Sequence, residues 1–115
     1  MKRFNCYFGL IALSLLFTPA YGQSEVNREC EKMVQYALIK HGEYGNGRSI
    51  ESLLEEEEKS GDSEKQKFYK MLVIEILDTF AVWDDPVEKN RIHKEINDHF
   101  MAICDPNKIK NVFDE

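Results

Sequence analysis

The chain has 115 residues and carries a formal net charge of −6 at pH 7. This length allows one small domain with a limited core. An acidic chain lacks the basic patches that nucleic acids and anionic membrane surfaces require, so we expect neither as a partner. The excess of acid instead suits a cationic partner protein, and solubility alone is an equal explanation for it.

The first part of the chain has the pattern of a secretory signal peptide. Lys2 and Arg3 form a basic start, the uncharged apolar stretch "CYFGLIALSLLF" follows, and we expect cleavage after Gly22. A membrane anchor is the alternative interpretation, but the apolar stretch is shorter than the roughly 20 residues that a spanning helix needs. The sequence therefore predicts a signal peptide over 1–22, one domain over 23–115, and a location in the periplasm or outside the cell, without membrane contact after cleavage.

The cysteine count predicts a disulfide bond. The chain has three cysteines, and removal of the signal peptide takes Cys6 away and leaves Cys30 and Cys104. Two cysteines in an oxidising compartment usually pair. Cys104 lies at the expected end of a helix, where the helix dipole disfavours the thiolate that a catalytic cysteine needs. We therefore expect a structural bridge between Cys30 and Cys104 rather than a nucleophile.

Apolar residues at three- and four-residue spacing predict helices in the first half of the mature chain. The first helix is expected from about Glu25 to His41, with Gly42 just beyond its last turn and "GEYGNGR" as a loop. Ser49 is expected to cap a short second helix. The acidic run from Glu55 to Glu58 is interpreted as a solvated helix end.

Two further helices are expected in the second half. Ser63 and Gln66 form a capping-box pattern, and the almost wholly apolar stretch from Phe68 to Trp83 predicts a buried central helix. Asp85-Pro86 is expected to open the fourth helix and Asp105-Pro106 to end it. A last amphipathic turn is expected to pack back on the body through Ile109, Val112 and Phe113.

This order of helices predicts an all-α fold, a small antiparallel bundle of about four helices with short connections. The first helix of such a bundle begins at the same end at which the fourth helix finishes. Cys30 and Cys104 would therefore meet at about the 5.5 Å Cα separation that a disulfide requires. The fold and the predicted bridge support each other.

The sequence contains few candidates for catalysis or metal binding. Glu95 and His99 share one helix face and could supply two metal ligands, but we interpret them as a solvated pair because a third ligand would have to come from elsewhere. His41 is interpreted as a partner of the helix C-terminal dipole. No serine stands in a nucleophile motif and no glycine pattern cradles phosphate. We therefore predict no catalytic residue, no metal site, no cofactor and no enzymatic activity.

Three residues are candidates for a protein interface: Tyr44, Trp83 and Asp84. Both aromatic residues lie at a loop or a helix end, where aromatic side chains often anchor interfaces. Asp85 is assigned as the helix cap, so Asp84 is left without a structural role and could be exposed beside Trp83. For Trp83 we favour the alternative that it closes the core, because large aromatic side chains are usually mostly buried.

The mature chain also resembles a family of known proteins. It has a cysteine in the first helix, an apolar run "MLVIEILDTF", a proline-opened helix "DDPVEKNRIHKEI" and a closing segment "HFMAIC". From Cys30 to Cys104 it resembles small single-disulfide helical proteins secreted by Gram-negative bacteria, among them the periplasmic immunity proteins that neutralise amidase toxins of type VI secretion systems. The resemblance implies a helical fold and a protein partner.

These observations together predict a secreted or periplasmic interaction protein that is not an enzyme, with an immunity or inhibitor role. One alternative is a periplasmic binding protein or chaperone-like carrier, which would need an apolar groove. The other alternative is a metal-dependent enzyme that uses Glu95 and His99.

Overall fold

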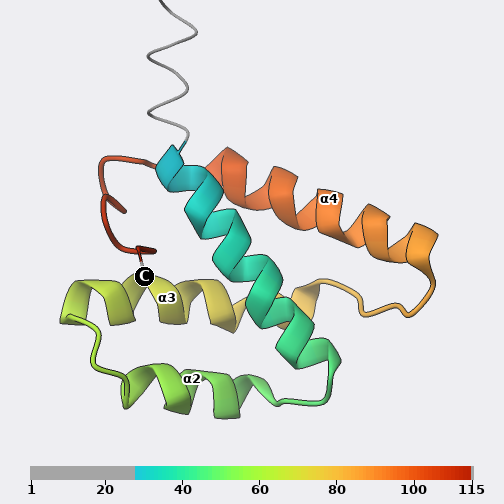
Figure 1. Cartoon of the computed structure of the whole chain (residues 1–115), viewed down its shortest axis with the longest axis horizontal. Helices are drawn as coiled ribbons and strands as arrows, with labels where there is room; N and C mark the ends of the chain where they lie inside the picture. The colour runs from blue at the N-terminus through green and yellow to red at the C-terminus, as the bar shows by residue number, and fades with distance from the viewer. Residues whose placement is uncertain (1–27, 115) are drawn as a thin grey trace, which may run out of the picture.

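The computed structural model describes residues 28–114 and shows an all-helical chain (Figure 1). The N-terminal helix covers 28–45, α2 Ile50–Glu58, α3 Glu64–Glu75 and α4 Pro86–Ile103, and the 3-10 helix η1 covers Leu77–Thr79. No strand occurs over 28–114, and the predicted all-α fold is confirmed. The predicted signal peptide (1–22) and the expected start of the first helix at Glu25 lie outside the described residues.

The N-terminal helix, α3 and α4 share one core. In Figure 1, α2 and α3 run in opposite directions as a contacting pair, α4 runs opposite to α3, and the N-terminal helix crosses them. Within this described part of the chain, no helix is long and apolar enough to span a membrane. The largest cluster of buried side chains joins the N-terminal helix, α3, η1, α4 and the last residues: Met33, Val34, Ala37, Val73, Leu77, Ile92, Ile96, Phe100, Ile109, Val112 and Phe113.

The three predicted helix starts are confirmed. The hydroxyl of Ser49 accepts a hydrogen bond from the Ser52 N–H at 3.0 Å, and Asp85 caps α4 in the same way. Ser63 and Gln66 form the reciprocal capping box, with bonds of 3.2 and 2.9 Å. These caps satisfy first-turn N–H groups that have no partner within their helix.

The prediction that the first helix ends at His41 with Gly42 beyond it is wrong. The helix continues through Gly42 to residue 45, and the chain turns at Gly47, whose φ of 108° favours glycine. A glycine inside a helix costs only about 1 kcal/mol relative to alanine. The Arg48 guanidinium pairs with Glu43 in the added turn at 2.8 Å, which favours the longer helix.

The prediction of a buried helix from Phe68 to Trp83 is also wrong. The α-helix α3 ends at Glu75, the chain tightens into η1, and residues 80–85 are not helical. The hydroxyl of Thr79 donates to the Ile76 carbonyl at 2.6 Å and holds this tighter turn. Only one side of α3 faces the other helices, so Phe68 is 59% exposed and Leu72 is also exposed.

The last residues return to the body, as predicted. Ile109, Val112 and Phe113 are all buried. The Phe113 ring lies 5.3 Å from the Tyr36 ring of the N-terminal helix, centroid to centroid. The side-chain amide of Gln66 on α3 donates to the Val112 carbonyl at 3.3 Å. The segment 105–114, which we call the tail, is therefore part of the core.

Candidate interaction surface

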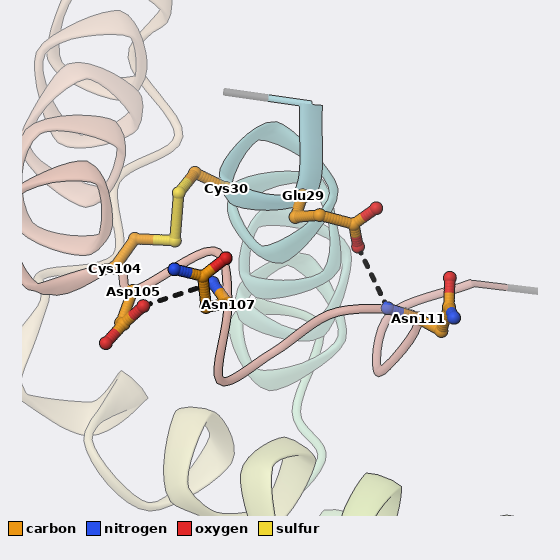
Figure 2. The surroundings of a disulfide bond; sticks show 6 residues. All are labelled: Glu29, Cys30, Cys104, Asp105, Asn107 and Asn111. Carbon is orange, nitrogen blue, oxygen red and sulfur yellow. Dashed lines mark hydrogen bonds between the residues drawn. A yellow bond between two sulfur atoms is a disulfide. The ribbon is translucent and has the colours of Figure 1, made fainter. Parts of the chain in front are cut away.

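The bridge joins the first turn of the N-terminal helix to the residue that follows α4. Figure 2 shows Cys30 and Cys104 bonded, with their Cα atoms 5.8 Å apart, and the predicted disulfide is confirmed. In the same view the Glu29 carboxylate accepts a hydrogen bond from the Asn111 backbone N–H at 3.1 Å. An ion pair between Lys32 and Asp114 adds a further contact. The start of the N-terminal helix and the tail are thus fastened together.

Trp83 lies on the surface rather than in the core. Its side chain is 47% exposed, and the expectation that it closes the core is wrong. Phe80 packs inward instead, with its ring 6.2 Å from the Phe100 ring and 5.6 Å from the His99 ring. Because the helix ends before Phe80, the following residues run over the outside of the bundle. Val82 is exposed beside Trp83.

A small cavity lies next to Trp83. Its volume is about 140 Å³, and it is formed by the end of the N-terminal helix, the connection 81–84 and the first turns of α4. It brings together Trp83 and Asp84 of the predicted interface. Tyr44 does not line it, but its ring lies 6.1 Å from that of His41. The polar and aromatic lining includes His41, Asn46, Trp83, Asp84, Lys89 and His93.

His41 lines this cavity, and its imidazole is fixed by the Phe80 carbonyl. Its Nε2 atom lies 3.2 Å from the Phe80 carbonyl oxygen, which can only accept, so Nε2 carries the proton and Nδ1 is an acceptor in the neutral ring. The side chain is 7% exposed and lines the cavity. The interpretation of His41 as a partner of the helix-end dipole is wrong, because the helix continues beyond it and the imidazole is fixed to Phe80.

A second hollow, which we call the apolar groove, lies between α3, the last turn of α4 and the tail. Its volume is about 240 Å³. This groove was not predicted, and the signal for it in the sequence is the pair of apolar residues Leu72 and Ile103, which remain exposed. Its apolar lining includes Met33, Tyr69, Leu72, Ile76, Ile103 and Ile109.

One member of the acidic run is buried. Glu57 is only 8% exposed, and its carboxylate accepts hydrogen bonds from the Tyr36 hydroxyl at 3.4 Å and the Ser60 hydroxyl at 3.1 Å. Burial, and then the neighbouring Asp62, raise the pKa of Glu57. Hydrogen bonds from Glu57 and from Lys70, whose Nζ lies 2.8 Å from the Asp62 carboxylate, lower the pKa of Asp62. The interpretation of the run as a wholly solvated helix end is therefore wrong at Glu57.

Glu57 is expected to make stability fall as the pH rises. Its raised pKa means that the folded state keeps this proton to a higher pH than the unfolded state, so the free energy of unfolding decreases above the ordinary glutamate pKa of 4.5. The lowered pKa of Asp62 has the opposite effect on stability at lower pH. The free energy of unfolding decreases on acidification below 3.8, because the unfolded state takes up this proton first. Glu57→Gln should therefore flatten the profile from pH 4.5 to neutral pH and raise stability at neutral pH, as measured by urea unfolding.

The control for this titration is the exposed neighbour in the same helix. Glu58→Gln removes the same charge without touching the buried cluster, so its profile should follow that of the wild-type protein. Parallel profiles for Glu57→Gln and the wild-type protein across this pH range would contradict the assignment of the titration to Glu57.

The candidate metal ligands Glu95 and His99 have other partners. The Glu95 carboxylate pairs with the Arg91 guanidinium at 2.6 Å. The His99 ring packs edge-on against Phe80 and Phe100. Over residues 28–114, no three His, Cys, Asp or Glu side chains form a group that could hold a metal ion. The pair is part of a charged, aromatic-lined helix surface.

The fold places Trp83 and Asp84 at a cavity, whereas Glu95 and His99 contact different side chains. Comparisons with protein-family models, with curated proteins and with solved structures find no match to this chain.

Proposed function

We propose that this chain is a secreted or periplasmic interaction protein, without enzymatic activity, that binds another protein through the Trp83 surface. This surface comprises Val82, Trp83, Asp84 and the cavity beside them. An immunity or inhibitor role against a toxin is the form of this function that the sequence resemblance implies. The exposed Trp83 at the mouth of a cavity is the observation that carries the proposal.

The chemistry of this surface suits a protein partner. An exposed tryptophan supplies a large rigid contact area and is among the side chains that dominate binding energy in interfaces. Residues 81–84 make no hydrogen bond within the described part of the chain, so their backbone N–H and carbonyl groups are free for a partner. A disulfide is compatible with the proposed compartment, because disulfides persist where conditions are oxidising.

The apolar groove favours a second candidate function, that of a carrier. Leu72 and Ile103 are exposed at this groove, and its wall is mainly apolar. Such a groove could hold an apolar ligand or an unfolded segment of another protein. Variants in the two regions can separate this candidate from the interaction protein, because Leu72 does not line the cavity beside Trp83.

The proposed function predicts a partner that depends on Trp83. The immobilised mature chain should retain one stoichiometric protein from a periplasmic extract of its own organism. Loss of a hot-spot side chain costs about 2 kcal/mol or more, so Trp83→Ala should weaken binding by about thirtyfold. Affinity can be measured with the purified partner by calorimetry.

The control is a second exposed aromatic side chain on a different face. Phe68→Ala removes an aromatic ring from α3 and should leave the affinity unchanged. Equal binding by Trp83→Ala and Phe68→Ala would contradict the proposal. The carrier would instead be favoured by two results together. The protein would bind an apolar fluorophore and lose this binding on Leu72→Asn, and no partner protein would depend on Trp83.

A further inference from the structure

We infer that the cavity beside Trp83 receives a single arginine side chain of the partner protein. The inference rests on the proposed function and names the chemistry that this surface recognises. It depends on the size of the cavity, on the acceptors that line it, and on the charges around it.

The size of the cavity selects one planar group. Pockets for drug-sized ligands and cofactors usually measure about 300–1,000 Å³. This cavity, at about 140 Å³, is much smaller. It is close to the engineered cavity of about 150 Å³ that binds benzene. A guanidinium group with the end of its alkyl chain is of this order, whereas a cofactor is not.

The lining of the cavity offers two acceptor groups that have no hydrogen-bond partner over residues 28–114. The Asp84 carboxylate makes no hydrogen bond or ion pair within residues 28–114. In the neutral imidazole of His41, Nδ1 is an acceptor because Nε2 donates to the Phe80 carbonyl. A guanidinium carries five N–H donors and no acceptor, so it can satisfy both groups at once.

Trp83 adds a surface on which a guanidinium can stack. Its side chain is half exposed at the cavity, so a partner side chain can reach it. Arginine stacks on aromatic faces through its planar, weakly hydrated cation, and tryptophan is the strongest aromatic partner for such contacts. A lysine ammonium would pair with Asp84 but would not reproduce the stacking or the forked donor geometry.

The ends of two helices set the local field. The C-terminal end of the N-terminal helix, at Gly45 and Asn46, lines the cavity and favours a cation. The opposite field of the α4 N-terminus is offset by Asp85, whose carboxylate accepts from the Glu88 N–H at 3.1 Å. The Glu88 carboxylate is itself paired with the Arg91 guanidinium at 2.7 Å and adds little to the field.

Two basic side chains in the lining oppose a cation. Lys89 is exposed and has no ion-pair partner within the described residues, so its long chain can move toward solvent. His93 is exposed as well. Lys89 should therefore weaken the binding of arginine without preventing it, and its removal provides a test of opposite sign to the removal of Asp84.

The test uses Trp83 as its own reporter, because it is the only tryptophan in the chain. The mature protein is titrated with the peptide acetyl-Gly-Arg-Gly-amide while tryptophan fluorescence is recorded. We expect saturable binding with Kd on the order of 1 mM, as for one buried side chain. Asp84→Asn should weaken it about tenfold, because it removes a charge-assisted hydrogen bond, and Lys89→Gln should strengthen it severalfold.

Matched controls make the result specific. The citrulline peptide has nearly the same shape without the charge and should bind at least tenfold more weakly. Asp78→Asn removes an exposed acid that does not line the cavity and should leave the affinity unchanged. Absence of saturable binding, equal binding of the citrulline peptide, or equal affinities for Asp84→Asn and Asp78→Asn would each overturn the inference.

The inference and the proposed function can fail separately. A partner that is lost with Trp83→Ala but is indifferent to Asp84→Asn and Lys89→Gln would retain the proposed function and overturn the arginine pocket. A partner whose affinity falls with Asp84→Asn and rises with Lys89→Gln would support both the proposed function and the arginine pocket.

Discussion

Replacement of both bridge cysteines by alanine is expected to lower the free energy of unfolding by about 4 kcal/mol. Cys30 and Cys104 are 74 residues apart in sequence, so the bridge removes much conformational freedom from the unfolded chain. Domains have total stabilities of only about 5–15 kcal/mol, with small ones at the low end. The double variant should therefore be marginally folded at 25 °C. Urea unfolding followed by circular dichroism measures the change.

A reductant separates the effect of the bridge from that of the substitutions. The wild-type protein treated with a reductant should lose about the same stability as the alanine variant, whereas the alanine variant should not respond to it. Unchanged unfolding midpoints in both experiments would show that the bridge contributes no stability.

Phe113→Ala is expected to cost about 3–5 kcal/mol, the usual range for removing a buried phenylalanine. Phe113 is 6% exposed and packs against Tyr36 although it lies in the last turn of the tail. Loss of its ring would leave a cavity over the N-terminal helix and loosen the tail. The change can be measured by urea unfolding, and hydrogen exchange should show faster exchange at the amide of Val112, which donates to the Ile109 carbonyl.

The matched control for this substitution is an exposed apolar residue. Val87 is 72% exposed, and Val87→Ala should change the stability by no more than about 0.5 kcal/mol. A cost for Phe113→Ala as small as that for Val87→Ala would show that the tail does not belong to the core in solution.

The helix starts could be predicted because they depend on neighbouring residues. Ser49, Ser63 and Asp85 each bond to a backbone N–H three residues along the chain, and such bonds leave a sequence pattern. The disulfide could be predicted from the cysteine count and from the number of helices, because four antiparallel helices return the chain to the end of the bundle where it began. Both inferences needed no knowledge of which faces pack together.

The helix ends could not be predicted, because they depend on tertiary contacts. Nothing between Phe68 and Trp83 resembles a stop signal, yet α3 ends at Glu75 so that Leu77 and Phe80 can turn into the core. Gly42 resembles a stop signal but lies inside a helix whose next turn packs near Val82; an added Cβ on Gly45 would lie 3.3 Å from that side chain. Packing overrides local preference at both points.

The candidate site was only partly predictable. Trp83 and Asp84 were identified because they stand at a break in the helical pattern, but the cavity is formed by three segments that only the fold brings together. Glu57 could not be distinguished from its acidic neighbours, because its burial depends on Tyr36, 21 residues earlier in the chain. Its role follows from the three-dimensional contact alone.

The position of the bridge has a practical consequence for studying the molecule. The contacts of Glu29 with Asn111 and of Lys32 with Asp114 place the entry of the chain and its tail at one pole of the domain (Figures 1 and 2). The N-terminal helix then carries the chain about 20 Å away, at 1.5 Å per residue, to the opposite pole, where the Trp83 surface lies. A tether, label or fused domain attached beyond residue 114 should leave that surface facing outward and accessible.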